Sequence, residues 1–122
     1  DKTVKRSASL WNQYEISCST LRYVDRKSSS DESLAIAKIE THYFVNNCFL
    51  KENYILNNLK NIYKIRCNII QGRHDVICPP YNALLLAKKM KNSNITIVED
   101  GGHSAFEGNM FDEVVKSLNN IY

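Results

Sequence analysis

Two short apolar runs in the second half of the chain, each leading into a glycine-containing turn, most constrain its fold. The first, 67–71, leads into Gly72-Arg73-His74-Asp75, and the second, 94–98, leads into Asp100-Gly101-Gly102-His103. Apolar runs of this length, bounded by turn residues, are typical of buried strands. The intervening stretch, 81–91, has a helical pattern. Because two strands joined by a crossover helix pair in parallel, the sequence predicts a βαβ unit here.

The two turns place an acid after the first strand, at Asp75, and a histidine after the second, at His103. The carboxyl ends of parallel strands meet at one edge of a sheet, so these side chains should converge. In the α/β-hydrolase superfamily the triad acid and histidine follow the nucleophilic serine in this order. There the acid orients the imidazole, and the histidine takes and returns the proton. Gly101 and Gly102 allow the backbone conformations that such a turn can require.

The nucleophile of such a triad is not in this sequence. No Gly-x-Ser-x-Gly occurs among the 122 residues, so we expect the serine to lie upstream. Ser104 directly follows His103 and does not sit on the strand-to-helix turn that exposes such a serine. We therefore expect the chain by itself to be inactive.

The first half of the chain, up to about Lys64, has helical patterning and no strong strand. Helices are predicted at 4–17 and 53–63, and a third after the polar loop 25–30, with Ser30 or Asp31 as its N-cap. We assign 1–63 to a helical cap portion and 64–122 to a βαβα part that closes with a helix at about 110–121. A two-stranded parallel sheet is poorly covered by itself, which predicts further strands elsewhere and self-association of the isolated chain.

Composition excludes several other classes of function. The net charge of +3 is slight, and no aromatic residues are interleaved with the one tight basic cluster, Lys88, Lys89 and Lys91, which argues against nucleic-acid binding. No apolar run approaches the length of about 18 residues that a membrane span needs. The four cysteines and three histidines have no metal-ligand spacing, so we expect no metal or other cofactor. Unpaired cysteine spacing favours a reducing compartment, and we expect a cytoplasmic protein.

Motifs along the chain resemble those of the proline iminopeptidase (prolyl aminopeptidase) family, serine peptidases of the α/β-hydrolase superfamily. The Gly-Arg-x-Asp and Gly-His pieces recur in many hydrolases, whereas the block Ile-Glu-x-His-Tyr-Phe is specific to this family. The resemblance covers the chain from about Leu10 to its end, in the stretches 11–15, 37–44, 47–50, 70–79 and 98–104.

The resemblance implies that the chain is α/β and forms the C-terminal portion of an α/β-hydrolase that releases N-terminal proline from peptides. It further implies that Asp75 and His103 are the triad acid and base, and that Glu15 and Glu40 receive the free amine of the substrate. The family usually has tyrosine where His74 stands, and we expect His74 to be a packing replacement.

Two carboxylates suit this amine-binding role on physical grounds. A partly desolvated pair attracts a cation, and its mutual repulsion penalises a neutral occupant. The secondary ammonium of proline presents two donors, one for each of Glu15 and Glu40. Taken without the resemblance, either residue is by default a solvent-facing helical glutamate. Trp11 is expected either to support this pocket or to be plain core.

Two alternatives remain open. The chain could be part of another α/β-hydrolase, such as an esterase or epoxide hydrolase, in which the two glutamates are incidental. It could also act, as it stands, as a non-catalytic folding or interaction module. Comparing cleavage of proline-naphthylamide and of a simple acyl ester by the full-length protein distinguishes an aminopeptidase from another α/β-hydrolase. An active-site serine probe applied to this chain tests whether it is a non-catalytic module.

Overall fold

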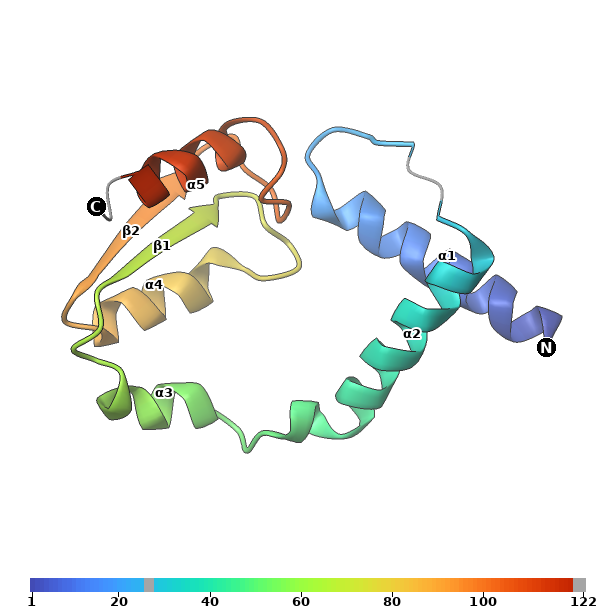
Figure 1. The fold of residues 1–122 in the computed structure, drawn as a ribbon, viewed down its shortest axis with the longest axis horizontal. Helices are drawn as coiled ribbons and strands as arrows, with labels where there is room; N and C mark the ends of the chain where they lie inside the picture. Colours follow the sequence, from blue (N-terminus) through green and yellow to red (C-terminus); the bar gives the residue numbers. More distant parts are fainter. Residues whose placement is uncertain (26–27, 120–122) are drawn as a thin grey trace. The chain divides into compact units, whose positions relative to one another are not determined.

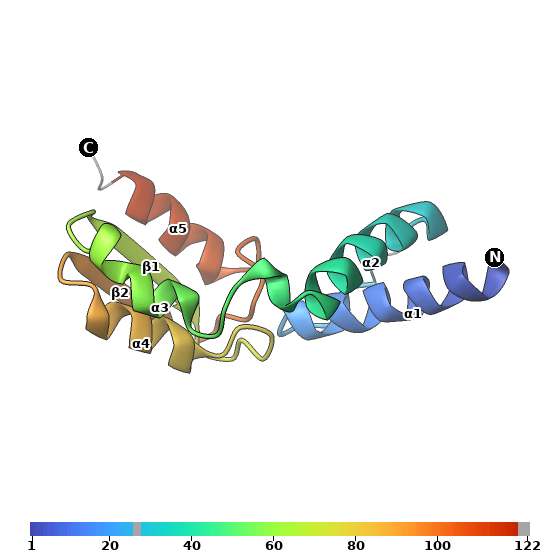
Figure 2. The ribbon, with the colours of Figure 1, turned by 90° about the horizontal axis from the view of Figure 1, so that it is seen from below.

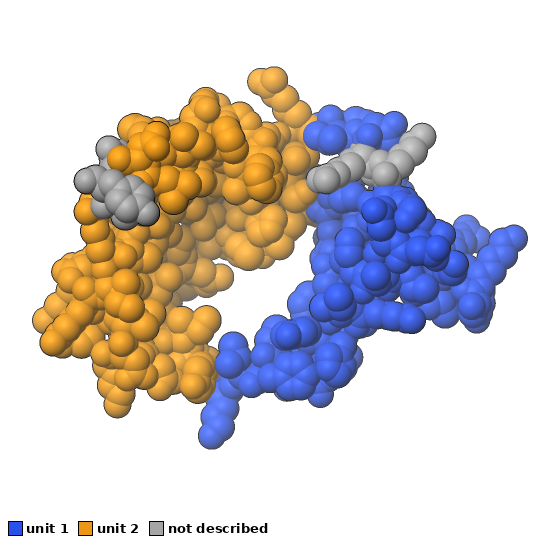
Figure 3. All heavy atoms as spheres, viewed as in Figure 1, with its two compact units in different colours: residues 1–17, 23–52 blue, residues 18–22, 53–122 orange. Residues whose placement is uncertain are grey.

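The computed structural model describes residues 1–25 and 28–119, which form helices and one two-stranded parallel sheet (Figure 1). The expected α/β class is therefore confirmed. Internal contacts group the chain into two compact units (Figure 3). The first comprises Asp1–Ser17 and Tyr23–Glu52, and the second comprises Cys18–Arg22 and Asn53–Tyr122. Positions 26–27 of the expected polar loop, and 120–121 of the expected last helix, lie outside the described residues.

The first unit is built on two helices, α1 (Lys2–Ser19) and α2 (Ser30–Val45). The N-cap of α2 is Ser29, not Ser30 or Asp31 as expected. The Ser29 side chain accepts the Glu32 backbone N–H at 3.2 Å, and the Glu32 side chain accepts the Ser29 N–H at 2.9 Å. This reciprocal pair is a capping box, which satisfies two amides that the first turn would otherwise leave without partners.

Side-chain bonds join α1 to α2. Asn12 and Ser33 are both buried, and the Asn12 amide donates to the Ser33 hydroxyl at 3.2 Å. Lys5 forms an exposed ion pair with Asp31 at 2.6 Å. The hydrogen bond from Lys5, followed by its charge, lowers the pKa of Asp31. The pair therefore stabilises the fold above the ordinary pKa of the carboxyl and is lost on acidification, although solvent screening keeps its contribution small.

A left-handed turn follows α2. Asn47, Cys48 and Phe49 form a one-turn 3-10 helix, η1, with positive φ angles of 50°, 53° and 57°. None of the three is glycine, so each Cβ crowds the backbone in this conformation. Backbone strain is therefore concentrated at this turn.

Replacing Cys48 by glycine is expected to raise the free energy of unfolding by about 0.5 to 1 kcal/mol, because relief of the left-handed strain exceeds the added chain entropy of glycine. Urea unfolding of the wild type and Cys48→Gly measures the difference. Cys48→Ala is the matched control, since it removes the exposed thiol and keeps the Cβ. A glycine variant no more stable than the alanine variant would contradict the strain argument.

The helix expected at 53–63 is shorter than predicted. It consists of α3 (Tyr54–Asn58) and the 3-10 turn η2 (Leu59–Asn61). Asn53 has a φ of 55°, which is left-handed and outside the helix. Of the apolar stripe expected on this segment, Leu59 is buried, whereas Ile55 and Ile62 are exposed. The segment thus lacks both the length and the buried face that would extend it.

The second unit contains the predicted βαβα sequence. Its elements are β1 (Cys67–Gly72), α4 (Pro80–Lys89), β2 (Ser93–Val98) and α5 (Asn109–Asn119). The strands pair in parallel from Cys67 opposite Ser93 to Gly72 opposite Val98, as expected. Figures 1 and 2 show α4 and α5 on opposite faces of the sheet, and each helix contacts both strands.

The bounds of α4 have local causes. Pro79 precedes the helix and Pro80 occupies its first turn, where no backbone N–H is needed. Lys88 and Lys89 lie in the last turn, where their charges suit the helix dipole. The helix ends at Lys89, two residues before the expected end, because the backbone of Met90 is extended. Within the described ranges, no helix has the combination of length and apolarity that crossing a membrane requires.

Candidate active site

The loops that follow β1 and β2 bring Asp75 and His103 into contact. His103 Nδ1 lies 3.0 Å from Asp75 Oδ2 and 3.2 Å from Asp75 Oδ1. A carboxylate accepts only, so the proton of a neutral imidazole belongs on Nδ1 and the lone pair on Nε2. The Asp75 side chain is 7% exposed and the His103 side chain 36% exposed. The acid is thus buried behind the ring, while the ring reaches solvent.

Asp75 is held by its own turn and by one buried amide. The backbone N–H groups of Ile77 and Cys78 donate to Oδ1 at 3.0 and 2.7 Å. Gln71 Nε2 donates to Oδ2 at 3.3 Å and to the Cys78 carbonyl at 3.2 Å. Together with His103, these donors give both oxygens of the buried carboxylate hydrogen-bond partners. Sequence analysis missed Gln71, although a polar residue at the end of an apolar run is the kind of signal that marks a buried hydrogen-bonding role.

The glycines of the two turns serve close approach of the backbones. A Cβ on Gly72 would lie 2.1 Å from the Gly102 carbonyl oxygen, and one on Gly101 would lie 2.7 Å from Met110 Sδ. Among the described glycines, only Gly108 has a positive φ, 49°. Gly101 and Gly102 therefore do not use the left-handed conformations that glycine allows. Glycine is required at Gly72 because the loop carrying the acid and the loop carrying the histidine touch there, whereas a Cβ on Gly101 would mainly displace the flexible Met110 side chain.

Gly72→Ala is expected to destabilise the intact protein by about 2 to 4 kcal/mol, because the added methyl overlaps a backbone oxygen that cannot move independently. The intact protein is this chain together with any further segment that is synthesised with it. Thermal unfolding measures the loss. Gly102→Ala is the control, since its Cβ would meet its nearest neighbour at 3.3 Å and should cost far less. Equal losses for both variants would refute the close-approach explanation.

An ion pair also bridges the two loops. The guanidinium of Arg73 donates to both carboxylate oxygens of Glu99, and both side chains are exposed. The bond to Glu99 raises the pKa of Arg73, and the bond to Arg73 lowers the pKa of Glu99. Next to it, the His74 side chain is exposed, while its backbone N–H donates to the Gly101 carbonyl at 3.0 Å. The expectation that His74 is a packing replacement therefore stays a prediction, because no contact of its side chain within the described residues supports it.

The two predicted amine-binding glutamates lie in the first unit, whereas Asp75 and His103 lie in the second. Glu40, on α2, is half-buried, and its Oε2 accepts the indole N–H of Trp11 at 2.7 Å. Glu15 is half-buried on α1, one turn after Trp11, and so lies on the same face of that helix. Trp11 is 38% exposed, so it is not plain core. Its hydrogen bond orients the Glu40 carboxylate.

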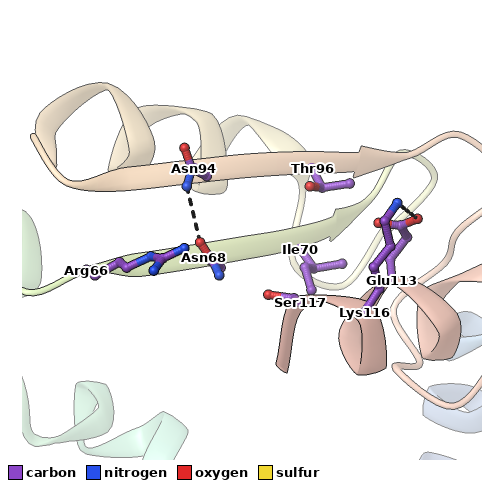
Figure 4. Close-up of a pocket in the computed structure, with 8 residues that line it drawn as sticks. All are labelled: Arg66, Asn68, Ile70, Asn94, Thr96, Glu113, Lys116 and Ser117. Atoms are coloured by element: carbon purple, nitrogen blue, oxygen red, sulfur yellow. Dashed lines mark hydrogen bonds and ion pairs between the residues drawn. The ribbon is translucent and has the colours of Figure 1, made fainter. Parts of the chain in front are cut away.

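A hollow of about 260 Å³ lies where α5 passes over the sheet, and neither Asp75 nor His103 lines it (Figure 4). Asn94 donates to Asn68 across the strands there, at 3.3 Å, and Lys116 pairs with Glu113. In residues 1–25 and 28–119, no three histidine, cysteine or acidic side chains cluster in a way that could hold a metal ion.

No protein-family model matches the chain. The chain is nevertheless similar to several curated proteins. A proline iminopeptidase of Arabidopsis thaliana is 38% identical over 114 residues, which cover 89% of this chain and 30% of that protein. One of Xylella fastidiosa (strain 9a5c) is 37% identical over 115 residues, 89% of this chain and 36% of that protein. One of Neisseria meningitidis serogroup A is 39% identical over 90 residues, 73% of this chain and 29% of that protein. The chain thus spans about a third of the length of these relatives.

Proposed function

Because the chain resembles a C-terminal part of proline iminopeptidases, we propose that it supplies the acid and the base of a serine aminopeptidase of the α/β-hydrolase fold. The observation that carries the proposal is the contact between His103 Nδ1 and Asp75 Oδ2 at 3.0 Å, at the loops following parallel strands. A histidine oriented by a buried carboxylate is the arrangement that general-base activation of a serine requires. The serine and the oxyanion-hole donors belong to a segment outside the printed sequence.

In the proposed reaction, Nε2 of His103 takes the proton of the serine as its oxygen attacks the carbonyl of an N-terminal proline. Asp75 stabilises the imidazolium that forms. The imidazolium then protonates the departing amine of the peptide, which leaves an acyl-enzyme. Water, activated by the same histidine, hydrolyses the acyl-enzyme and releases proline.

Glu15 and Glu40 provide the recognition step of the proposal. The substrate must present a free, charged amine, and two partly buried carboxylates favour such a cation over a neutral internal peptide nitrogen. The bond from Trp11 uses Oε2 of Glu40 and fixes the plane of that carboxylate. The other oxygen, Oε1, is the one we assign to the substrate ammonium.

Comparing two substrates in the intact protein tests this function. We expect hydrolysis of proline-naphthylamide at a kcat/KM well above that for an amide whose amine is acetylated, together with labelling of a serine by a fluorophosphonate. Cleavage of a simple acyl ester without cleavage of proline-naphthylamide would instead indicate an esterase-type relative. Absence of both activities and of labelling would contradict the catalytic proposal.

The printed chain by itself is expected to self-associate and to show no peptidase activity. Large apolar side chains are open to solvent in both units, among them Val45 at 78% and Phe106 at 86% exposure. Exposed apolar groups and unpaired strand edges favour association. Light scattering over a concentration series measures the mass. A monodisperse monomer at high concentration, or stoichiometric labelling by a fluorophosphonate, would contradict this expectation.

A further inference from the structure

Glu107 joins two segments of the second unit that are far apart in the sequence. It lies in the loop between His103 and α5. Its carboxylate accepts the backbone N–H of Leu21 at 3.0 Å on Oε2 and at 3.1 Å on Oε1. The N–H of Arg22 donates to Oε1 at 3.2 Å. One side chain thus binds two consecutive amides of the segment Cys18–Arg22, which belongs to the same unit as His103.

The residues on either side of His103 touch the same segment. The Ser104 N–H donates to the Ser19 carbonyl at 2.8 Å. A Cβ on Gly102 would lie 3.3 Å from the Ser19 carbonyl oxygen and 3.4 Å from Glu107 Oε2. The backbone before and after His103 is therefore in contact with Cys18–Arg22, and the Glu107 carboxylate lies against both.

The position of the His103 ring depends on this loop. Asp75 is fixed from within its own turn by the Ile77 and Cys78 amides. The His103 side chain is 36% exposed, so its position follows the backbone that carries it. A shift of about 1 Å in a reacting group lowers a rate by about 100-fold. Whatever holds the His103 loop therefore also sets the geometry of the pair.

The geometry points to Glu107 as a positioning residue, which acts through the His103 loop and touches neither substrate nor reacting atoms. This inference rests on the proposed function. A carboxylate suits the task because its two oxygens face two adjacent amides, and bonds to a charged acceptor are stronger than neutral ones. Losing the acceptor leaves both amides without that partner and frees the loop, while the sheet between α4 and α5 stays intact.

Two variants of the intact protein separate positioning from packing. Glu107→Leu keeps the approximate size of the side chain and removes both acceptors, and we expect kcat to fall by about 100-fold with KM nearly unchanged. Glu107→Gln keeps one acceptor oxygen but loses the charge, and we expect a smaller but measurable loss in kcat of about three- to tenfold. Glu113→Leu is the control, since it removes another half-buried glutamate of this unit, paired with Lys116 on α5, and should leave kcat unchanged.

NMR provides a readout that needs no turnover. We expect the downfield proton signal of His103 Nδ1, which reports its bond to Asp75, to weaken or vanish in Glu107→Leu and to persist in Glu113→Leu. Amide exchange at Leu21 and Arg22 should accelerate in the same variant. If the intact protein hydrolyses neither test substrate, the proposed function fails and this signal still decides the positioning role.

Retention of both kcat and the His103 signal in Glu107→Leu would overturn the inference. So would equal losses in Glu107→Leu and Glu113→Leu, which would indicate general destabilisation. Should Glu107→Leu fail to fold, Glu107→Gln decides alone. Unchanged kcat, His103 signal and amide exchange in Glu107→Gln would then reject a role for the charge.

Discussion

Replacing His103 by alanine in the intact protein is expected to lower kcat for proline-naphthylamide by up to about 10⁴-fold, and Asp75→Asn should have an effect of similar size. His103→Ala removes the base. Asp75→Asn leaves the shape of the buried side chain but presents an amide toward Nδ1 where a carboxylate accepted its proton, which favours the wrong tautomer. Because the two residues act together in the same catalytic step, the double variant should have a kcat hardly lower than that of either single variant.

His74→Ala is the matched control for this experiment. His74 stands next to Asp75 in the same turn, its side chain is exposed, and the bond of its backbone N–H to Gly101 does not depend on the side chain. We expect its kcat to stay close to wild type. Comparable losses in His74→Ala and His103→Ala, or activity retained in Asp75→Asn, would reject the assignment of acid and base.

The second half of the fold was predictable because its signals are local. The apolar runs that became β1 and β2 end at turn residues, and a crossover helix leaves parallel pairing as the simple solution. The same reasoning anticipated the meeting of Asp75 and His103, since it depends only on the direction of the strands. The purpose of the glycines was not predictable from local pattern. Whether Gly72 serves a backbone angle or a close approach depends on what lies opposite it.

The first half shows two kinds of error. Three consecutive serines made the start of α2 ambiguous, although Ser29 and Glu32 have the spacing of a capping box, which could have decided it. The apolar spacing of the segment after Asn53 predicts one long helix. Asn53 adopts a left-handed conformation, and the apolar stripe is only partly buried, so tertiary context shortened the helix.

Other parts of the candidate site depend on contacts that no local pattern indicates. Glu107 binds amides more than eighty residues earlier in the chain. Gln71 is one residue of a strand until Asp75 and the Cys78 carbonyl are placed beside its amide. The bond from Trp11 to Glu40 likewise requires α1 and α2 to be packed together. Such residues become visible only once the elements are assembled.

Glu15→Gln and Glu40→Gln are expected to lower kcat/KM for proline-naphthylamide by about 30-fold to several thousand-fold in the intact protein. Losing a charge-assisted contact to a desolvated ammonium costs about 2 to 5 kcal/mol. Both substitutions keep the size of the side chain. Cleavage of a small acyl ester, which has no amine to recognise, should be nearly unaffected. Because the two carboxylates bind one cation, the double variant should lose less than the sum of the single losses.

Glu52→Gln is the control for charge alone, because Glu52 is an exposed glutamate of the same unit. This variant should leave kcat/KM unchanged for both proline-naphthylamide and the acyl ester. The Trp11 bond makes a further distinction, since Glu40→Gln can still accept the indole N–H through its amide oxygen. A loss of proline-amide cleavage in this variant would therefore come from the missing charge and not from a displaced side chain. If the glutamate variants lose ester and proline-amide cleavage equally, Glu15 and Glu40 support the fold, and the proposed recognition of the amine is wrong.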